Sequence, residues 1–336
     1  MVRDSAAGTD LFLPNPSKAR EIDALVRGRF LDSLLWLDEP GLMADRAPAD
    51  WLARPVDFGF YFDLAAAKHH GAGPEAAPWR AAEVEALVAS LESEDRDAQT
   101  LRITTLGPTH YTRLEIDCLK RWFDLEPDNA IALVPLNEAP LRREEAAVRK
   151  AISVLESHAA DFHGELTAIT TELIFARPGP EARMRFGGAS SFSLWGGMAL
   201  SPHAEWWEYV PRLVHEYSHN LLFGLAADGP LVTNDPEARY HSPLRGTERP
   251  MDGIFHAFYV TGREALLRRR LDDALSGEAD EEMARLAGYC RRTLPQIVEA
   301  HEDCFAVVSE HAALTDLGER VVADTRASLG QTGSTT

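Results

Sequence analysis

The chain has 336 residues, of which 45% are hydrophobic and 26% are charged, as is ordinary for a soluble globular protein of one or two domains. Its formal net charge of −19 at pH 7 argues against nucleic acid or an anionic membrane as a partner, because both require a basic surface. No stretch has the length of a membrane span or the apolar core of an export signal, so we expect a cytoplasmic protein.

Residues 17–128 have the apolar spacing of helices, for example in AREIDALVRGRFLDSLLWL (19–37). They predict a helical N-terminal portion over residues 1–128. His69 and His70 precede Gly71 at an expected helix end, where the helix dipole favours positive charge. We therefore interpret these two histidines as capping residues rather than metal ligands.

A strand is predicted within residues 131–140, where a short apolar run is closed by a proline. A helix over 142–161 follows, and residues 165–176 fit either a helix or a strand. The glycine-punctuated, alternating segment 185–202 is typical of an edge strand or a hairpin. Its Gly196-Gly197 pair would allow a substrate backbone to approach closely, although a simple bulge explains it equally well.

The segment PRLVHEYSHNLLFGL (211–225) contains the pattern HExxH, formed by His215, Glu216 and His219. Positions i and i+4 lie on one face of a helix, so both imidazoles can bind a single metal ion. The surrounding apolar residues recur at helical spacing, as a helix packed on a core requires. The usual interpretation of this pattern is a zinc hydrolase in which Glu216 is the general base.

The third metal ligand decides the chemistry, because two histidines do not complete a site. Glu237 or Glu264 would suit a zinc peptidase with a glutamate ligand, although neither carries the accompanying pattern. The longer pattern HExxHxxGxxH fails, since no glycine and histidine follow in register. His256, near the start of an apolar helix, is the preferred third ligand, and two other histidines are weaker candidates, His203 and His241.

The segment RYHSPLRGTERPMDGIFHAFY (239–259) is rich in polar side chains for a simple connection. Together with VHEYSHNLL it resembles the HExxH motif-containing peptide modification proteins, described as α-ketoglutarate-dependent peptide β-hydroxylases of ribosomal-peptide gene clusters. The resemblance covers about residues 185–270. The matching positions are Tyr240, Ser242-Pro243, Arg245, Arg249-Pro250, Gly253 and His256.

The resemblance implies an Fe(II) ion held by His215, His219 and His256, with α-ketoglutarate and O2 as co-substrates. Three histidines without a carboxylate leave the ion more positive, which suits a dianionic co-substrate and also suits zinc. The distal carboxylate of α-ketoglutarate needs a bidentate cation, for which Arg245 and Arg249 are the candidates. Two hydroxyl groups are candidates for an additional hydrogen bond, those of Tyr240 and Ser242.

The implied reaction is hydroxylation of a Cβ position in a ribosomally synthesised peptide, with a leader-bearing precursor as a candidate partner. Glu216 is not needed as a base in this chemistry and would orient the substrate or hold a hydrogen bond near the metal. One alternative is a zinc metallopeptidase with Glu216 as general base. A second is a non-catalytic peptide-binding module whose metal is structural.

Residues 254–325 are predicted to be helical, and 326–336 to form a disordered tail. We therefore expect a mostly helical α+β protein with a zincin-like metal helix, a small sheet and a catalytic portion over 129–325. The three cysteines do not have disulfide or metal-pair spacing and are expected to be reduced and buried, with His301 and Cys304 serving packing. The sequence does not predict an oligomeric state.

Overall fold

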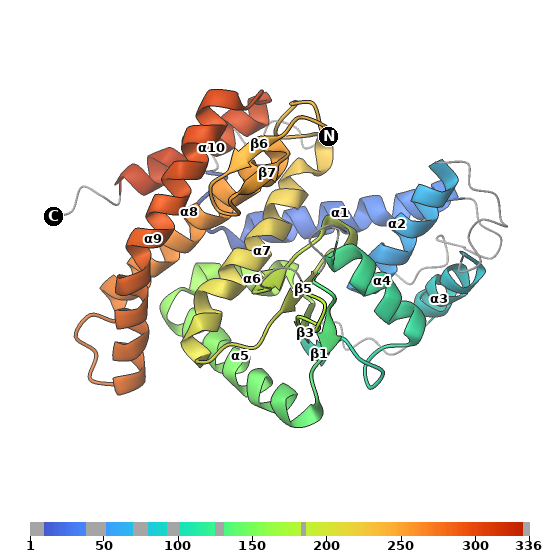
Figure 1. Ribbon diagram of the computed structural model, residues 1–336, viewed down its shortest axis with the longest axis horizontal. Coiled ribbons are helices and arrows are strands. Elements are labelled where there is room, and N and C mark those ends of the chain that lie inside the picture. The colour runs from blue at the N-terminus through green and yellow to red at the C-terminus, as the bar shows by residue number, and fades with distance from the viewer. Residues whose placement is uncertain are drawn as a thin grey trace. The chain divides into compact units, whose positions relative to one another are not determined.

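The computed structural model describes residues 10–37, 52–69, 80–92, 101–124, 131–182 and 186–331 (Figure 1). The chain divides into two compact units. The sheet unit comprises residues 18–147 and 167–204, and the motif unit comprises 1–17, 148–166 and 205–336. The predicted boundary at residue 128 lies outside the described residues, and the described helices before it and strands after it belong to the sheet unit.

The sheet unit contains three parallel strands, β1 (Arg102–Thr105), β3 (Glu172–Arg177) and β5 (Gly197–Leu200), in the order β1-β3-β5. Two short strands pair in the antiparallel sense, β2 (Val134–Pro135) with β3 and β4 (Gly188–Ala189) with β5. Strands β3 and β5 are almost entirely buried, as parallel strands usually are. The predicted strand at 131–140 and hairpin at 185–202 are confirmed.

The described part of the sheet unit also contains α1 (Pro16–Leu37), α2 (Pro55–His69), α3 (Arg80–Glu92), α4 (Arg113–Phe123) and the first half of α5 (Glu138–His158). Every third or fourth residue of α1 is buried, as the sequence spacing predicts. His69 lies in the last turn of α2, in agreement with its predicted capping position, and His70 lies outside the described residues. Thr112 caps α4 through a capping box with Glu115.

Gly196 and Gly197 are explained by the packing of the chain itself. Gly196 has a φ of +80°, a conformation that side chains rarely adopt, and a Cβ there would lie 2.8 Å from Oγ1 of Thr171. A Cβ on Gly197 would lie 2.8 Å from that of Pro55. The space beside these two glycines is therefore occupied by Thr171 and Pro55 of the protein itself, rather than by a substrate backbone.

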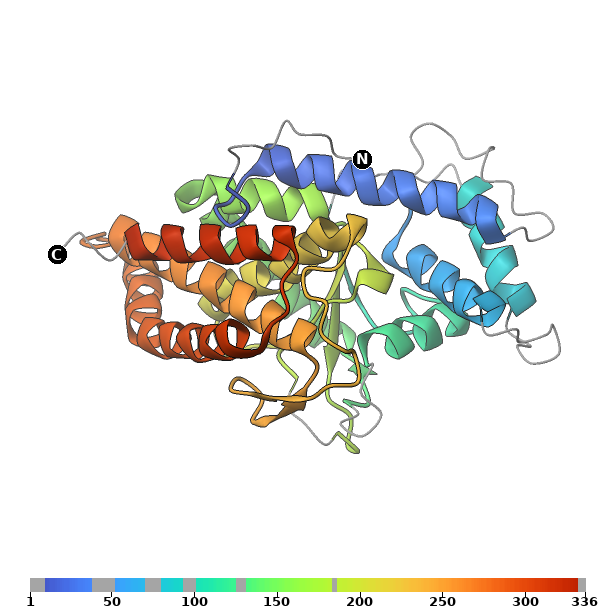
Figure 2. The same ribbon diagram turned by 90° about the horizontal axis from the view of Figure 1, so that it is seen from above.

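The motif unit is built from helices and one small hairpin. Its helices are the second half of α5 (Glu138–His158), most of α6 (Ala160–Ile169), α7 (Tyr209–Leu225), α8 (Met251–Ala274), α9 (Glu281–His311) and α10 (Asp316–Gln331). Residues 165–176 are thus the end of α6 followed by β3. Helices α8 and α9 form a helical hairpin, and Figure 2 shows α10 beside it. Residues 326–331, which were predicted to belong to the disordered tail, are helical in α10, and residues 332–336 lie outside the described residues.

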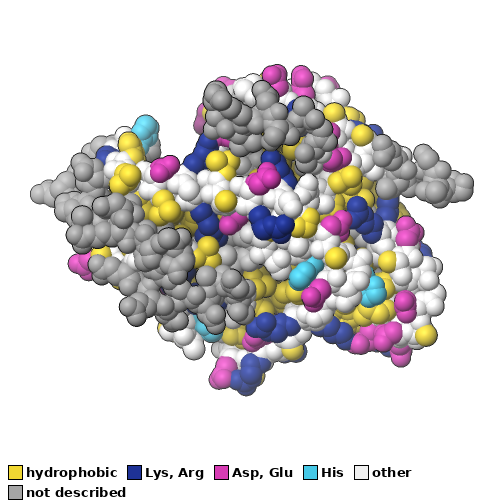
Figure 3. Space-filling model, turned by 180° about the vertical axis from the view of Figure 1, so that it is seen from behind, with side chains coloured by type: hydrophobic (Ala, Val, Ile, Leu, Met, Phe, Trp, Pro, Cys, Tyr) yellow, Lys and Arg dark blue, Asp and Glu magenta, His cyan; other side chains and the backbone are white. Residues whose placement is uncertain are grey.

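Together the two units give a mostly helical α+β protein, as predicted. The three cysteines are buried and unpaired, also as predicted. Among the described helices, none combines the length and the apolar character that crossing a membrane requires. On the face seen in Figure 3, the described basic side chains lie singly or in small groups among acidic ones.

Candidate metal centre

Helix α7 brings the two motif histidines together. The ring centroids of His215 and His219 are 5.0 Å apart, and their Nε2 atoms are 3.3 Å apart. Two nitrogen ligands at about 2.1 Å from one ion lie about 3.0–3.4 Å from each other in octahedral or tetrahedral geometry. Both side chains are partly exposed. The pair therefore has the separation of two ligands of one ion on an accessible face of the helix.

One charged neighbour of Glu216 lies on the same helix. Glu216 is buried, and its Oε1 is 3.7 Å from Nη1 of Arg212, one helical turn earlier. Sequence reasoning overlooked Arg212, although its i,i+4 spacing to Glu216 is a recognisable signal. Glu216 is therefore paired with a cation beside the histidines.

The inner face of α7 is anchored by a buried arginine of α8. Arg263 is fully buried, forms an ion pair with Glu165 of α6, and donates to Oγ of Ser218 at 2.9 Å. The hydroxyl of Tyr217 donates to the same Glu165 carboxylate at 2.9 Å. Although burial opposes the charge, Glu165 and two tyrosines hold the pKa of Arg263 above its ordinary value. The two central residues of HExxH thus hold the motif helix in place.

Glu264, the next residue of α8, contacts the outer edge of His215. Its Oε1 lies 2.5 Å from Nδ1 of His215, and its Oε2 forms an ion pair with Arg268. Burial opposes ionisation of this carboxyl, but Arg268 and His215 outweigh it and hold the pKa of Glu264 well below its ordinary value. Glu264 is therefore an anion bound to the His215 nitrogen that faces away from His219.

His256, the predicted third ligand, reaches the cluster at a different edge. Its ring stacks on that of His219 with centroids 5.3 Å apart, and the two Nδ1 atoms are 3.1 Å apart. Phe223 covers the His256 ring with centroids 4.4 Å apart. The three predicted histidines thus share one cluster, but His256 contacts Nδ1 of His219 rather than the Nε2 pair. Within the described part of the chain, no three histidine, cysteine or acidic side chains are arranged to hold one ion.

Both His219 and His256 are held neutral, the form in which imidazole binds a metal. Burial lowers the pKa of His256 to about 4, with a weaker opposing effect of Asp252. Burial also holds the pKa of His219 well below its ordinary value. Nearby groups act in the same direction on His219, namely His215, His256, Arg245 and Arg212.

The four residues predicted to bind the co-substrate lie on or beside one hairpin, β6 (Tyr240–Ser242) and β7 (Thr247–Arg249). Arg245 occupies its exposed turn, and its charge acts on His219. Arg249 ends β7, and a Cβ on Gly253 would lie 3.6 Å from its Nε. Ser242 is buried. The hydroxyl of Tyr240 accepts a hydrogen bond from Asn234 at 3.0 Å, and the ring stacks on His311.

The other predicted ligand candidates lie elsewhere. Glu237 is exposed and faces Arg239, with 3.9 Å between the charged atoms. His241 is exposed and lies 3.8 Å from Glu248, and His203 belongs to the sheet unit.

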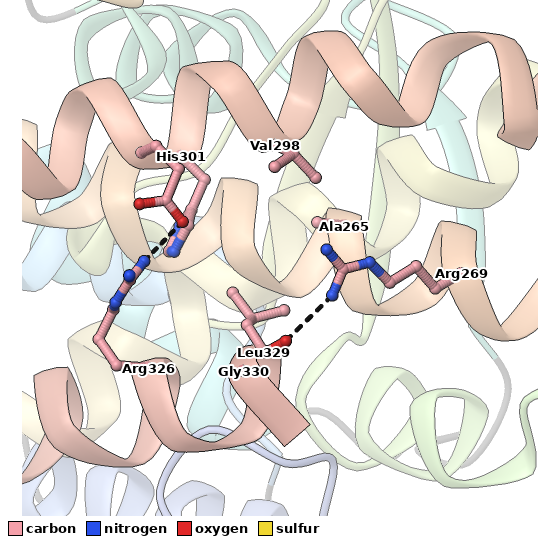
Figure 4. A pocket seen from close by; sticks show the side chains of 8 residues that line it. Ala265, Arg269, Val298, His301, Arg326, Leu329 and Gly330 are labelled. Atoms are coloured by element: carbon pink, nitrogen blue, oxygen red, sulfur yellow. Dashed lines mark hydrogen bonds and ion pairs between the residues drawn. The ribbon is translucent and has the colours of Figure 1, made fainter. Parts of the chain in front are cut away.

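A separate cavity of about 100 Å³ lies between α8, α9 and α10 and includes no residue of the motif. Figure 4 shows Arg269 on one side of it and His301 and Arg326 on the other. His301 is buried, and its Nδ1 lies 2.9 Å from the carbonyl oxygen of Phe258. This contact agrees with the packing role predicted for His301.

Comparison of the chain with protein-family models and with curated proteins finds no match.

Proposed function

We propose that the chain is an Fe(II)- and α-ketoglutarate-dependent oxygenase that hydroxylates a Cβ position of a ribosomally synthesised peptide. The observation that carries this proposal is the pair of Nε2 atoms of His215 and His219, 3.3 Å apart and influenced by the charge of Arg245. Two converging imidazole nitrogens suit a divalent metal, and Arg245, whose charge lowers the pKa of His219, suits an anionic co-substrate.

The donor set fits such a metal in part. His215 and His219 would hold it through Nε2, and His256 is the proposed third ligand. For this role the His256 ring must turn from its contact with Nδ1 of His219 toward the Nε2 pair. When bound, Fe(II) with α-ketoglutarate and O2 supplies the oxidation of a C–H bond to C–OH, with succinate and CO2 as the other products. Imidazole ligands are equally suited to zinc.

The hairpin of β6 and β7 would bind the distal carboxylate of α-ketoglutarate. Arg245 is the stronger candidate, because its charge reaches His219, whereas Arg249 packs beside Gly253. A guanidinium can donate two parallel hydrogen bonds to one carboxylate. Ser242 and Tyr240 would support the hairpin, since the first is buried and the second is bonded to Asn234.

Glu216 would orient the substrate or hold a hydrogen bond near the metal rather than act as a general base. Its carboxylate lies 3.7 Å from the Arg212 guanidinium, which restrains it beside the histidines. Hydroxylation at carbon does not require a general base, so a restrained carboxylate suits this reaction.

The proposal extends to the fold and the partner. It includes a zincin-like metal helix, α7, and a peptide partner that carries a leader in its precursor form. It does not involve nucleic acid or a membrane.

The direct test is succinate formation. The protein is purified without oxygen, loaded with Fe(II), and supplied with α-ketoglutarate, O2 and a candidate precursor peptide. We expect peptide-stimulated succinate and a peptide that gains one oxygen atom. His256→Ala is expected to abolish metal binding, whereas His241→Ala, at an exposed position, should leave it unchanged. Wild-type protein that binds the metal but not α-ketoglutarate would contradict the proposal.

The zinc metallopeptidase alternative rests on Glu216 beside two metal-binding histidines. Its candidate third ligands receive little support, because Glu264 contacts Nδ1 of His215 and Glu237 is exposed. Zinc-dependent cleavage of the peptide would favour this alternative. Peptide binding without turnover would favour the non-catalytic module with a structural metal.

A further inference from the structure

The contact between His215 and Glu264 joins α7 to α8 at the candidate metal centre. The Glu264 side chain is only 6% exposed, and its Oε1 lies 2.5 Å from Nδ1 of His215. An ionised carboxylate can only accept, so the imidazole must donate from Nδ1. A neutral ring that carries its proton on Nδ1 has its lone pair on Nε2.

That lone pair is directed to the place where a metal would bind. Nε2 of His215 is the atom that lies 3.3 Å from Nε2 of His219. A ring without an acceptor at Nδ1 can carry its proton on either nitrogen and can rotate about its χ2 angle. Glu264 therefore selects both the tautomer and the orientation in which His215 can bind a metal.

Arg268 holds the carboxylate in turn. Its guanidinium forms an ion pair with Glu264 one helical turn earlier, and its Nε donates to Oγ1 of Thr293 on α9 at 3.0 Å. It also lies over the ring of Tyr289, 5.8 Å from the centroid. Because α9 restrains Arg268 from two sides, the carboxylate of Glu264 is fixed before any metal arrives.

We propose that Glu264 and Arg268 are positioning residues of the metal centre: Glu264 orients His215 for metal binding through Nε2 and is not itself a ligand. This inference rests on the part of the proposed function that assigns the metal to α7. It does not depend on the identity of the co-substrate or of the peptide.

The test compares metal affinities in the absence of any turnover. Apo-protein is titrated with Co(II) or Zn(II) against a competing chelator, and the visible spectrum of Co(II) reports the coordination. We expect Glu264→Ala to weaken metal binding by about 10- to 100-fold, the usual effect of losing such a partner. The matched control is Glu281→Ala, which removes an exposed glutamate with the same i,i+4 spacing to an arginine, Arg285.

A second variant distinguishes a loss of metal binding from a loss of the folded structure. Glu264→Ala leaves Arg268 buried without its partner, whereas Glu264→Leu combined with Arg268→Met removes both charges and leaves no acceptor for Nδ1 of His215. The folded state of each variant is checked by circular dichroism. In the apo-protein, 15N NMR of His215 should show the Nδ1–H tautomer in the wild type and a shift toward Nε2–H in Glu264→Ala.

The outcomes separate this inference from the proposed function. Folded Glu264 variants that bind Co(II) and Zn(II) like the wild type would overturn the positioning role alone. Loss of the Co(II) spectrum with no change in the His215 tautomer would also overturn it, because the carboxylate would then be a ligand. Weakened metal binding in a protein that never forms succinate would leave the inference standing and remove the oxygenase. A wild type that binds no metal would remove both.

Discussion

Glu165→Gln is expected to destabilise the motif unit strongly, because it leaves the Arg263 guanidinium buried without a counter-charge. The two side chains form an ion pair between α6 and α8 and are 2% and 0% exposed. Removing one member of a buried pair costs about 3–5 kcal/mol, since the remaining charge cannot return to water. The equilibrium constant for unfolding should therefore rise by about two to four powers of ten.

The hydrogen bonds of Glu165 support a value within that range. Its Oε2 accepts from the hydroxyl of Tyr217 at 2.9 Å and from Arg263, and its Oε1 accepts from the backbone N–H of Asn15 at 2.8 Å. The amide nitrogen of glutamine cannot accept, so at least one of these donors loses its partner. A buried donor without an acceptor costs about 1–3 kcal/mol, and this cost is part of the total given above.

A matched control exists on the same two helices. Asp161 of α6 pairs with Arg270 of α8 at 2.6 Å, but these side chains are 36% and 35% exposed. Asp161→Asn should therefore cost no more than about 1 kcal/mol. Urea denaturation, followed by circular dichroism and by tryptophan fluorescence, measures both variants against the wild type.

Similar losses for Glu165→Gln and Asp161→Asn would refute the reasoning, since burial would then have no effect on the strength of the pair. The double variant Glu165→Leu with Arg263→Met should lie closer to the wild type than Glu165→Gln does, because it leaves no charge buried alone.

Three further predictions concern other groups. Burial and the neighbouring Asp63 raise the pKa of Glu83 in the sheet unit to about 9, above its value in the unfolded chain. The protonated Glu83 side chain therefore stabilises the folded state fully below about pH 4.5, and this stabilisation is lost as the pH rises toward 9. The free energy of unfolding of the wild type relative to that of Glu83→Gln, measured by urea denaturation at each pH, should fall over this range by up to about 1.4 kcal/mol per pH unit. His219→Ala should abolish metal binding measured by calorimetry, whereas Glu237→Ala, at an exposed position, should leave it unchanged. Arg245→Leu should raise the KM for α-ketoglutarate by about 10- to 100-fold with a smaller change in kcat, in line with the loss of a charge-assisted contact to its carboxylate. An unchanged KM would exclude Arg245 as the residue that binds this carboxylate.

The helices were largely predictable, because their signals are local. The apolar spacing of α1 and α7 and the capping residues near Thr112 and His69 act within a few turns of one helix. The division into units was not predictable in the same way. Residues 148–166 belong with the motif unit although they lie between segments of the sheet unit, and only tertiary packing decides this.

The candidate site shows the same distinction. HExxH predicts the His215–His219 pair from spacing alone, and i,i+4 spacing would also have indicated Arg212 beside Glu216. The contact of Glu264 with His215 spans 49 positions of sequence, and the position of His256 against Nδ1 of His219 depends on how α8 lies along α7. Residue types predicted the cluster, but which nitrogen faces which partner depends on helix packing.

Two consecutive residues of α8 make polar contacts that restrain α8 against α7. Arg263 bonds to Ser218 on the inner face of α7, and Glu264 bonds to His215 on the outer edge of its candidate centre. Arg263 and Glu264 are consecutive residues of one rigid helix. A shift of α7 that lengthened one of the two contacts would therefore also disturb the other. A buried polar network that is fully paired specifies geometry more sharply than apolar packing does. The orientation of His215 therefore depends on the same buried charges that hold α7 in place, and a variant that loosens Arg263 should weaken metal binding even though it touches no ligand.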